Sequence, residues 1–477
     1  MDYKKLGLKC GVEIHQQLAT KHKLFCGCSA AFQDKEPVFE IRRKLRPVAG
    51  ETGDVDAAAA YEALKNKTFR YKVYLNETCA VELDEEPPHQ INQEALNVAL
   101  QIALMLNCEV PEEIEIMRKT VLDGSNTSGF QRTALAGLNG WMDTSFGRVG
   151  ITNVCVEEDA CQILKKGRKT VVYGLNRLGI PLLEIGTSPD IHEPEQAKEV
   201  AEKIGMILRS TGKAKRGIGT IRQDLNISIS KGARCEIKGV QKLNMIPKII
   251  QLEVKRQREL IKKGKKVTKD VRRVLPSGKT EYMRPLPGAA RLYPETDVPP
   301  IEITHEKLIT MRKNLPELLT DRKANIIKKY RLNEELATQI MSSGKIDLFE
   351  ELASGHDPKT VANVLTKYSR KYNIPDEKLK EFFKVSGKKE LPKESLEKIL
   401  QGISDGRPIK ELIHSFAGKT LSENDVVRIV RDVIKKNPQA MNAPRPEQAL
   451  MGLIMKEVRG KASGSLVMKV LMKEIKK

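Results

Sequence analysis

Aromatic residues are scarce in this chain of 477 residues. They make up 4% of it, and Trp141 is its one tryptophan. A protein with so few aromatic rings does not bind nucleic acid mainly by stacking bases on them. If the chain binds nucleic acid, contacts to phosphates and to helix shape suit its composition better.

Long apolar segments are also missing. No run of 18 apolar residues occurs, so we expect no transmembrane helix and no membrane partner. The first residues, MDYKKLGLKC, lack the apolar stretch of a secretory signal. We therefore expect a cytoplasmic protein whose eight cysteines are thiols or metal ligands and not disulfides.

The cysteine pattern lacks half of a zinc motif. Cys26 and Cys28 form a C-x-C, Cys79 lies further along the chain, and His22 is close to the C-x-C. Structural zinc usually takes four ligands from two such knuckles, and the second knuckle is absent here. The pattern leaves a zinc site on Cys26, Cys28 and Cys79 open, but it favours buried free cysteines.

Two catalytic signatures are missing as well. The glycine-rich stretch 212–219 is not followed by Lys-Ser/Thr, so it is not a Walker A loop. No Ser-Ser-Lys or Thr-Lys nucleophile set for amide hydrolysis stands out. We therefore expect that the chain does not release ammonia from glutamine or asparagine by itself.

Positive charge, in contrast, is abundant. The formal net charge is +21, and charged residues make up 30% of the chain. Such an excess favours a polyanionic partner, and nucleic acid is the first candidate.

Acidic residues gather around one stretch, residues 154–185. A strand-like run ends in Glu157, Glu158 and Asp159, and the later run LNRLGIPLLEI places Glu184 among apolar residues. A buried carboxylate must be paired, hydrogen-bonded or bound to metal, and adjacent acids repel one another unless a cation neutralises them. Each acid alone fits a solvated turn or a salt bridge; the set favours a divalent-metal or acid–base site.

Two other segments carry polar groups. Alternation in residues 6–20 predicts a strand with Glu13 and His15 on one face, where they share a ligand or meet solvent or a neighbouring strand. A further strand delivers Lys119 to a polar loop, DGSNTSGFQR. Backbone N–H groups of such a loop can bind an anion, although most such loops are only turns. The loop residues concerned are Ser125, Asn126, Thr127 and Ser128.

The hydrophobic pattern predicts an α+β protein. Strand and helix patterns mix up to about residue 300, and only helical stretches follow. We expect a mixed α/β domain over 1–301, a helical domain over 302–392 and a helical tail over 393–477.

The end of the tail is predicted to be two helices around the basic turn RGKASGS. This turn would hold Lys456, Arg459 and Lys461 beside the N–H groups that begin the second helix, a geometry that can bind phosphates. An ordinary helical hairpin with solvated lysines is the alternative.

Taken together, seven motifs resemble the B/E family of tRNA-dependent amidotransferases, and most closely its archaeal E type. They are GVEIHQQL, RKTVLDGSNTSGFQRT, CVEEDA, LNRLGIPLLEI, GTIRQDLNISI, CEIKGVQKL and RPLPGAARLYPETDVPP. The resemblance implies an N-terminal cradle domain that uses ATP and Mg²⁺ to phosphorylate the γ-carboxylate of glutamate misacylated onto tRNA(Gln). Ammonia from a partner then displaces the phosphate to give Gln-tRNA(Gln), while the helical part grips the tRNA.

The resemblance also implies roles for particular residues. Its metal ligands correspond to Glu13, His15, Glu157 and Glu184. Its catalytic groups correspond to Glu157, Glu184 and Lys119, and the loop 125–128 would face ATP. Glu158, Asp159 and Asp224 are nearby candidates.

One departure from the family pattern is plain. Archaeal E-type chains carry an inserted domain before the strand LPSGKTEYMRPLPG, but here KKGKKVTKDVRRVLPSGKT bridges that point directly. Either the lineage lost the insert, or the chain is intermediate between the B and E types.

Alternatives for the function remain. An E-type chain implies an asparaginase-like partner that supplies ammonia; a B-type chain implies an amidase with a small third subunit, with Asp-tRNA(Asn) as a second substrate. A non-catalytic tRNA-binding scaffold would be favoured if Glu13, Glu157 and Glu184 were neutral residues, and they are not.

Overall fold

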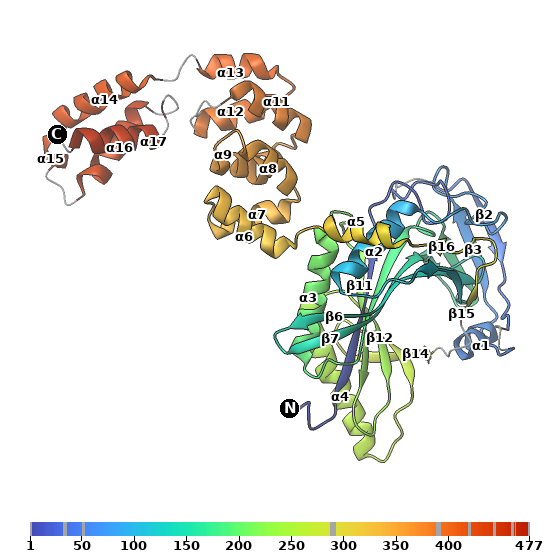
Figure 1. Ribbon diagram of the computed structural model, residues 1–477. Coiled ribbons are helices and arrows are strands. Elements are labelled where there is room, and N and C mark those ends of the chain that lie inside the picture. Colours follow the sequence, from blue (N-terminus) through green and yellow to red (C-terminus); the bar gives the residue numbers. More distant parts are fainter. Residues whose placement is uncertain are drawn as a thin grey trace. The chain divides into compact units, whose positions relative to one another are not determined.

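The computed structural model confirms an α+β protein with two compact units, Met1–Leu318 and Leu319–Lys477 (Figure 1). It describes residues 2–31, 36–49, 53–286, 292–387, 393–417, 421–441, 445–458, 462 and 464–475. The first unit contains all the described strands, and the second is helical.

A ten-stranded sheet, predominantly antiparallel, forms the body of the first unit. Its order is β14 (Thr280–Pro285), β13 (Asp270–Val274), β12 (Cys235–Val240), β11 (Ile221–Ser228), β1 (Lys9–Gln17), β10 (Pro181–Thr187), β7 (Gly147–Glu158), β6 (Phe130–Thr144), β5 (Ile116–Thr120) and β15 (Leu292–Pro294). The first strand of the chain therefore lies inside the sheet, between β10 and β11. This placement brings residues far apart in sequence onto one surface.

Helices α2 (Gln93–Met105), α3 (Pro194–Ser210) and α4 (Ile246–Lys262) cover one face of the sheet, as Figure 1 shows. The apolar stripe of α3 is buried, and Pro194 stands at the start of the helix, where its missing N–H costs nothing. Asn92 caps α2 by accepting a hydrogen bond from the Ala95 N–H. These helices and the sheet share one hydrophobic core, so the opposite face of the sheet is free to carry polar residues.

A smaller sheet lies beside that opposite face. Its order is β2 (Phe39–Arg43), β3 (Thr68–Val73), β9 (Thr170–Gly174) and β8 (Gln162–Lys166), and helix α1 (Ala57–Leu64) precedes β3. The pair β4 (Glu113–Ile114) and β16 (Ile301–Glu302) and helix α5 (His305–Lys313) complete the unit, with the short helical turn η1 (Leu243–Met245) before α4. Residues of the small sheet and of the large sheet line one cavity between them.

The second unit has two separate hydrophobic cores. One spans Ile326 to Ile413 and the other Val426 to Leu471. The elements of the first core are α6 (Leu319–Tyr330), α7 (Glu334–Ser343), α8 (Ile346–Ala353), α9 (Pro358–Asn363), the π-helical turn η3 (Val364–Tyr368), α10 (Ser369–Lys371), α11 (Asp376–Ser386), α12 (Lys393–Ser404) and α13 (Ile409–Ala417). The second core joins α14 (Glu423–Lys436), α15 (Pro438–Met441), α16 (Pro446–Val458) and α17 (Gly464–Ile475).

Domain limits in the packing differ from the predicted positions. Helix α5 packs against α2 and so belongs with the first unit, and the chain divides after Leu318. The second predicted limit lies between residues 392 and 393. It borders residues 388–392, which are outside the described part of the chain. Helices α12 and α13 share their core with the preceding helices, and the next core begins with α14.

None of the helices in the described part of the chain has both the length and the hydropathy needed to cross a bilayer. All eight cysteines are free, as expected.

Candidate active site

A cavity of about 1210 Å³ lies over the polar face of the large sheet. Strands β1, β7, β10, β11 and β12 supply its floor, and β14, α1 and the small sheet supply its walls. Eight of the predicted site residues line it: Glu13, His15, Lys119, Ser125, Asn126, Glu157, Glu184 and Asp224.

Strand register brings together Glu13, His15 and Glu184. His15 on β1 is directly opposite Glu184 on the antiparallel neighbour β10, and Glu13 is two residues along β1 on the same face. The His15 Nε2 atom lies 3.5 Å from Glu13 Oε1 and 3.5 Å from Glu184 Oε2. The predicted shared face is therefore confirmed.

Lys119 extends this cluster towards β7. Its ammonium group forms an ion pair with Glu157 and lies 3.1 Å from Glu184 Oε2. Asn153 Nδ2 donates to Glu184 Oε1 at 3.5 Å from the other side. Glu184 is thus a paired carboxylate, as its apolar surroundings require.

The charges in this cluster shift the pKa values of its members in opposite directions. Burial raises the pKa of Glu184, but Lys119 and His15 outweigh burial and hold that pKa well below its ordinary value. Burial, followed by the charge of Glu184, raises the pKa of Glu13 to about 7. Burial lowers the pKa of His15, yet its hydrogen bond and charge interactions with Glu184 raise it overall.

The donor atoms fit a divalent cation. Glu13, His15 and Glu184 offer two carboxylates and one imidazole, and their ligand atoms all lie within 4.8 Å of one another. Three carboxylates, Glu13, Glu157 and Glu184, lie around Lys119 and His15. Carboxylate oxygens are the protein ligands that Mg²⁺ prefers.

Asp224 and Lys238 form a second pair on the same floor. Asp224 accepts from Lys238 Nζ at 3.0 Å and from the Gly239 N–H at 2.9 Å. Burial raises the pKa of Asp224, but Lys238 and His15 outweigh burial, so this pKa lies below its ordinary value. Lys238 lines the same cavity. The sequence predicts that it shares a strand face with Glu236, but it was not among the predicted site residues.

Glu158 and Asp159, the other two acids of the triplet, contact other groups. Glu158 accepts from the Arg132 N–H at 3.1 Å, and Asp159 accepts from Gln17 Nε2 at 2.5 Å. Asp159 also lies 3.7 Å from Arg177 and 3.6 Å from Arg222. Arginines, which the sequence prediction did not consider, thus supply the cation that adjacent acids need.

The predicted anion loop contributes two of its four residues to the cavity wall. Ser125 and Asn126 line the cavity, and Asn126 Nδ2 is buried without a hydrogen-bond partner among the described residues. Thr127 Oγ1 instead donates to the Glu82 carbonyl at 2.6 Å, and Ser128 Oγ donates to the Phe130 carbonyl at 3.0 Å. Thr127 and Ser128 therefore use their hydroxyls to hold the loop in place.

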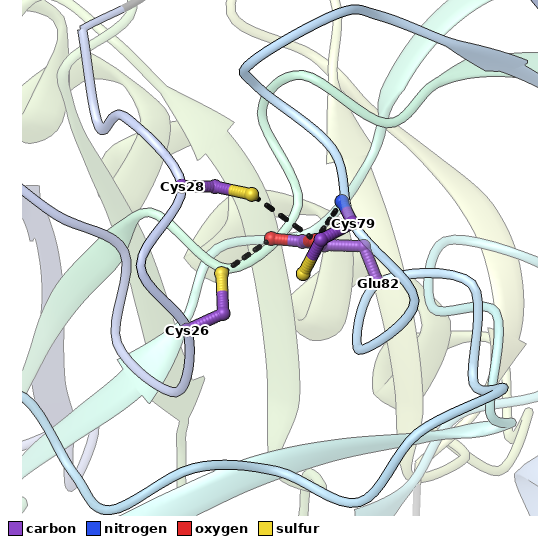
Figure 2. A group of neighbouring side chains, drawn as sticks. All are labelled: Cys26, Cys28, Cys79 and Glu82. Carbon is purple, nitrogen blue, oxygen red and sulfur yellow. Dashed lines mark hydrogen bonds between the residues drawn. The ribbon is translucent and has the colours of Figure 1, made fainter.

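The three cysteines of the incomplete zinc motif do come together. Cys26, Cys28 and Cys79 surround the Glu82 carboxylate, as Figure 2 shows. Glu82 was not among the residues proposed from the sequence. His22 is not part of this group; its Nδ1 atom lies 2.9 Å from the Gly27 carbonyl oxygen.

Of the predicted tRNA-binding residues, only Lys456 can be placed. It is exposed on α16. Arg459 and Lys461 lie outside the described residues. The two predicted helices, α16 and α17, are present, and α14 packs against both.

Comparison with known protein families assigns this chain to a class. Residues 8–309 match the GatB/GatE catalytic domain and residues 347–475 match the GatB domain. The chain belongs to the GatB/GatE family.

Within the family, it is similar over its full length to the archaeal E subunits of glutamyl-tRNA(Gln) amidotransferase. The E subunit of Methanocaldococcus jannaschii is 38% identical, and that of Methanococcus maripaludis is 36% identical; each alignment covers 100% of this chain and 99% of the relative. The corresponding protein of Thermococcus sibiricus is 36% identical over 99% of this chain and 98% of the relative.

These alignments extend over 622 to 627 positions, more than the 477 residues of this chain. The relatives therefore contain residues without a counterpart here, in keeping with the expected absence of an inserted domain.

Proposed function

We propose that this chain is the kinase and amide-forming component of a glutamyl-tRNA(Gln) amidotransferase. It uses ATP to phosphorylate the γ-carboxylate of glutamate on misacylated tRNA(Gln), and ammonia then replaces the phosphate to give Gln-tRNA(Gln). The names of the similar archaeal proteins support the overall reaction. The clustered acids of the cavity support the phosphorylation step.

One observation carries the proposal: Glu13, His15, Glu184, Glu157 and Lys119 converge at the floor of a large cavity. Phosphoryl transfer needs positioning and charge neutralisation more than covalent chemistry from the protein. A cluster with an excess of carboxylates and one ammonium can supply both, the carboxylates through a bound cation and the ammonium directly.

We assign the cation to Glu13, His15 and Glu184, with Glu157 beside them. When bound, Mg²⁺ supplies charge neutralisation for the phosphates of ATP. Glu13 and Glu184 offer oxygens that suit this ion, and His15 holds the two carboxylates near each other through its Nε2 atom. Glu157 keeps Lys119 in position at the edge of the group.

Lys119 is the proposed stabiliser of the transferring phosphoryl group. Its side chain is 14% exposed and lines the cavity, so its ammonium group can face a phosphate bound there. Asn126, whose amide nitrogen is buried and unpaired among the described residues, is the loop residue best placed to donate to ATP.

Two further parts of the reaction lie outside this cavity. Ammonia comes from another protein, and the body of the tRNA binds to another part of the chain. We propose an asparaginase-like partner as the ammonia source, because the similar relatives are E subunits. Co-purification with an amidase and a small third subunit would instead assign a B-type complex. We assign tRNA binding to the helical unit and to its basic end around Lys456.

The test uses the single chain with glutamyl-tRNA(Gln), γ-labelled ATP, magnesium chloride and ammonium chloride. We expect phosphate release and Gln-tRNA(Gln) without any partner. Replacement of Glu184 or Glu157 by Gln should lower turnover by at least about 100-fold, in the range seen when one group that stabilises a transition state is removed. Affinity for the tRNA should change little, because these acids hold the cation and not the RNA.

Glu281→Gln is the matched control. Glu281 also lines the cavity, but its side chain is 53% exposed and pairs with Arg273 on the neighbouring strand. Its turnover should stay close to that of the unaltered chain. Full turnover of Glu184→Gln would remove this residue from the site, and tRNA binding without any ATP hydrolysis by the unaltered chain would favour a scaffold.

A further inference from the structure

We propose that the exposed side of helix α4 and the connection that follows it, residues 248–269, bind the phosphates of an RNA helix, the tRNA stem next to the aminoacylated end. Nine basic and two acidic residues fall in this segment, a net charge of +7, which is one third of the +21 of the whole chain. The identity of the RNA rests on the proposed function. The surface itself belongs to the first unit and is separate from the basic end around Lys456.

Helix α4 has one buried face and one basic face. Core residues such as Ile250 and Val254 pack against the large sheet. On the exposed side, Lys248, Lys255 and Lys262 recur every seven residues, which is close to two helical turns, so they lie in one row. At about 1.5 Å per residue, this row is about 21 Å long.

The connection from α4 to β13 continues the row. It contains no acid and four exposed lysines, Lys263, Lys265, Lys266 and Lys269. Within residues 248–269, Glu259 is the one exposed acid. None of the exposed lysines of this segment forms an ion pair with another residue in the described part of the chain. Their charges are therefore available to a ligand.

The neighbouring helix α3 shows that a surface helix of this protein can balance its charges. Both helices have 17 residues and cover the same face of the sheet, but α3 has three basic and three acidic residues. Lys198 Nζ lies 3.5 Å from Glu202 Oε1, and Lys203 Nζ lies 3.0 Å from Glu199 Oε1, each pair one helical turn apart. Helix α4 lacks such pairs on its exposed side, so its surface is short of negative charge.

The helix dipole explains only part of this excess. Lysines at the end of a helix interact favourably with its free carbonyl groups, which accounts for Lys262 and Lys263. The effect falls off beyond the last turn, so it does not account for Lys265, Lys266 and Lys269. Like charges gathered in this way disfavour the folded chain by mutual repulsion, and a bound polyanion relieves that repulsion.

The position of the connection indicates which polyanion it meets. Asp270, directly after the connection, is paired in register with Cys235 on β12. Arg234, the residue before Cys235, lines the cavity, as does Arg273 on β13. The connection therefore lies beside the cavity wall, where the reacting end of the tRNA binds in the proposed function. The stem that follows this end presents phosphates, which suit a surface of lysines without aromatic rings.

The first measurement is a lysine footprint of the unaltered chain. Lysines are acetylated with and without tRNA(Gln), and the modified positions are quantified by mass spectrometry. We expect tRNA to reduce the modification of Lys262, Lys265 and Lys266. The exposed lysines of α11 are the internal reference and should be modified equally in both samples: Lys378, Lys380 and Lys384.

The second measurement replaces Lys262, Lys265 and Lys266 by Gln in one variant. Each phosphate that is no longer neutralised lowers the slope of log affinity against log salt concentration by about 0.7 to 0.9, so three lost contacts lower it by about 2 to 3. The KM for tRNA should rise, whereas phosphate release at saturating tRNA should keep its rate. Three Lys→Gln changes at the α11 lysines control for overall charge, and an unchanged melting temperature confirms that each variant is folded.

Unchanged acetylation of the three lysines in the presence of tRNA would overturn the proposal, as would equal salt slopes for the α4 variant and the α11 control. Loss of a co-purifying protein at unchanged tRNA affinity would assign the surface to an acidic protein partner and would also overturn it. Failure of the proposed function is a separate result, because it appears as absent turnover in the unaltered chain and not as a changed salt slope in the variant.

Discussion

At the scale of single residues, one ammonium group serves two carboxylates. Lys119 pairs with both Glu157 and Glu184, which come from neighbouring strands and would otherwise repel each other. Lys119 therefore has a structural role in the resting cavity and a proposed catalytic role during phosphoryl transfer. Substitutions that keep or remove its charge can separate these two roles.

We predict that Lys119→Met lowers the rate of phosphate release by about 100-fold or more, because it removes the positive charge proposed to stabilise the transferring phosphoryl group. Lys119→Arg keeps the charge and should retain part of the activity, although its planar head fits the two carboxylates differently. Single-turnover kinetics with saturating tRNA and ATP measure this step. Lys166→Met, at an exposed position lining the same cavity, is the control and should leave the rate unchanged. Equal rates for Lys119→Met and the control would assign Lys119 a structural part only.

How far the sequence predicts the site depends on the residue. The strand alternation around Glu13 and His15 fixes their common face, and the apolar run around Glu184 requires a partner for it; the structure shows both. Glu158 and Asp159 were less predictable, because neighbours along a strand point apart and their partners, Arg132 and Arg177, lie elsewhere in sequence. Contacts such as that of Glu82 with the cysteines depend on loop geometry that periodicity does not encode.

At the scale of elements, a buried ion-pair group holds the edge of the large sheet. Glu295, just after β15, pairs with Arg118 on β5 and Arg132 on β6. The Glu295 side chain is 0% exposed, so loss of both arginines would leave an uncompensated buried charge. The short strand β15 is therefore joined to the sheet by charge as well as by its backbone hydrogen bonds.

We predict that this group makes stability depend on acid pH. Burial raises the pKa of Glu295, but Arg118, the Asp297 N–H and Arg132 lower it below the ordinary value of a glutamate. The ionised carboxylate therefore stabilises the fold above about pH 4.3, the pKa in an unfolded chain, and the contribution is lost as the pH falls through the folded-state pKa. Glu295→Gln should cost about 3–5 kcal/mol at neutral pH, and its stability should fall less between neutral and acid pH.

Chemical denaturation monitored across this pH range measures the difference between the two proteins. Glu85→Gln is the control, because Glu85 pairs with Arg43 but its side chain is 67% exposed. An exposed pair contributes no more than about 1 kcal/mol. Parallel pH profiles for Glu295→Gln and the unaltered chain would contradict the prediction.

Helices were more predictable than strand order. The stripe of α3 and the Ser422–Asp425 capping box of α14 are local patterns, and both appear in the structure. The position of β1 between β10 and β11 is set by pairing across more than half of the first unit, which no local pattern records. The limit after Leu318 was missed for a similar reason: α5 is helical like its successors but packs on α2.

At the scale of the whole molecule, the helices that carry the basic C-terminal residues, α16 and α17, pack in a hydrophobic core of their own together with α14. Helices α14, α16 and α17 bury Val426, Val430 and Leu471 together. Removal of residues 446–477 alone would therefore expose the apolar face of α14. Substitution of charges on the surface tests tRNA binding without this damage.

We predict that Lys456→Gln, Lys469→Gln and Lys473→Gln together weaken tRNA binding and reduce its salt dependence. All three lysines are exposed, on α16 and α17. Each phosphate that is no longer neutralised should lower the slope of log affinity against log salt concentration by about 0.7 to 0.9. Filter binding at several salt concentrations measures the slope. The rate of phosphate release at saturating tRNA should stay unchanged, because the acids of the cavity lie in the other unit.

A matched set is available on α11, where Lys378, Lys380 and Lys384 are exposed. The same Lys→Gln changes there lower the net charge equally. If both triple variants weakened tRNA binding to the same degree, the effect would come from overall charge. Helices α16 and α17 would then form no specific tRNA-binding surface. An unchanged slope in the α16–α17 variant would place tRNA binding elsewhere.

The central position of β1 has a consequence for synthesis on the ribosome. Residues 9–17 leave the ribosome first, but their partners on β10 and β11 are residues 182–186 and 221–228. Until both segments emerge, β1 has two unpaired edges, which are open to aggregation. The nascent chain must hold this strand in a non-native or chaperone-bound state while more than two hundred residues are made, so the floor of the cavity is completed late in translation.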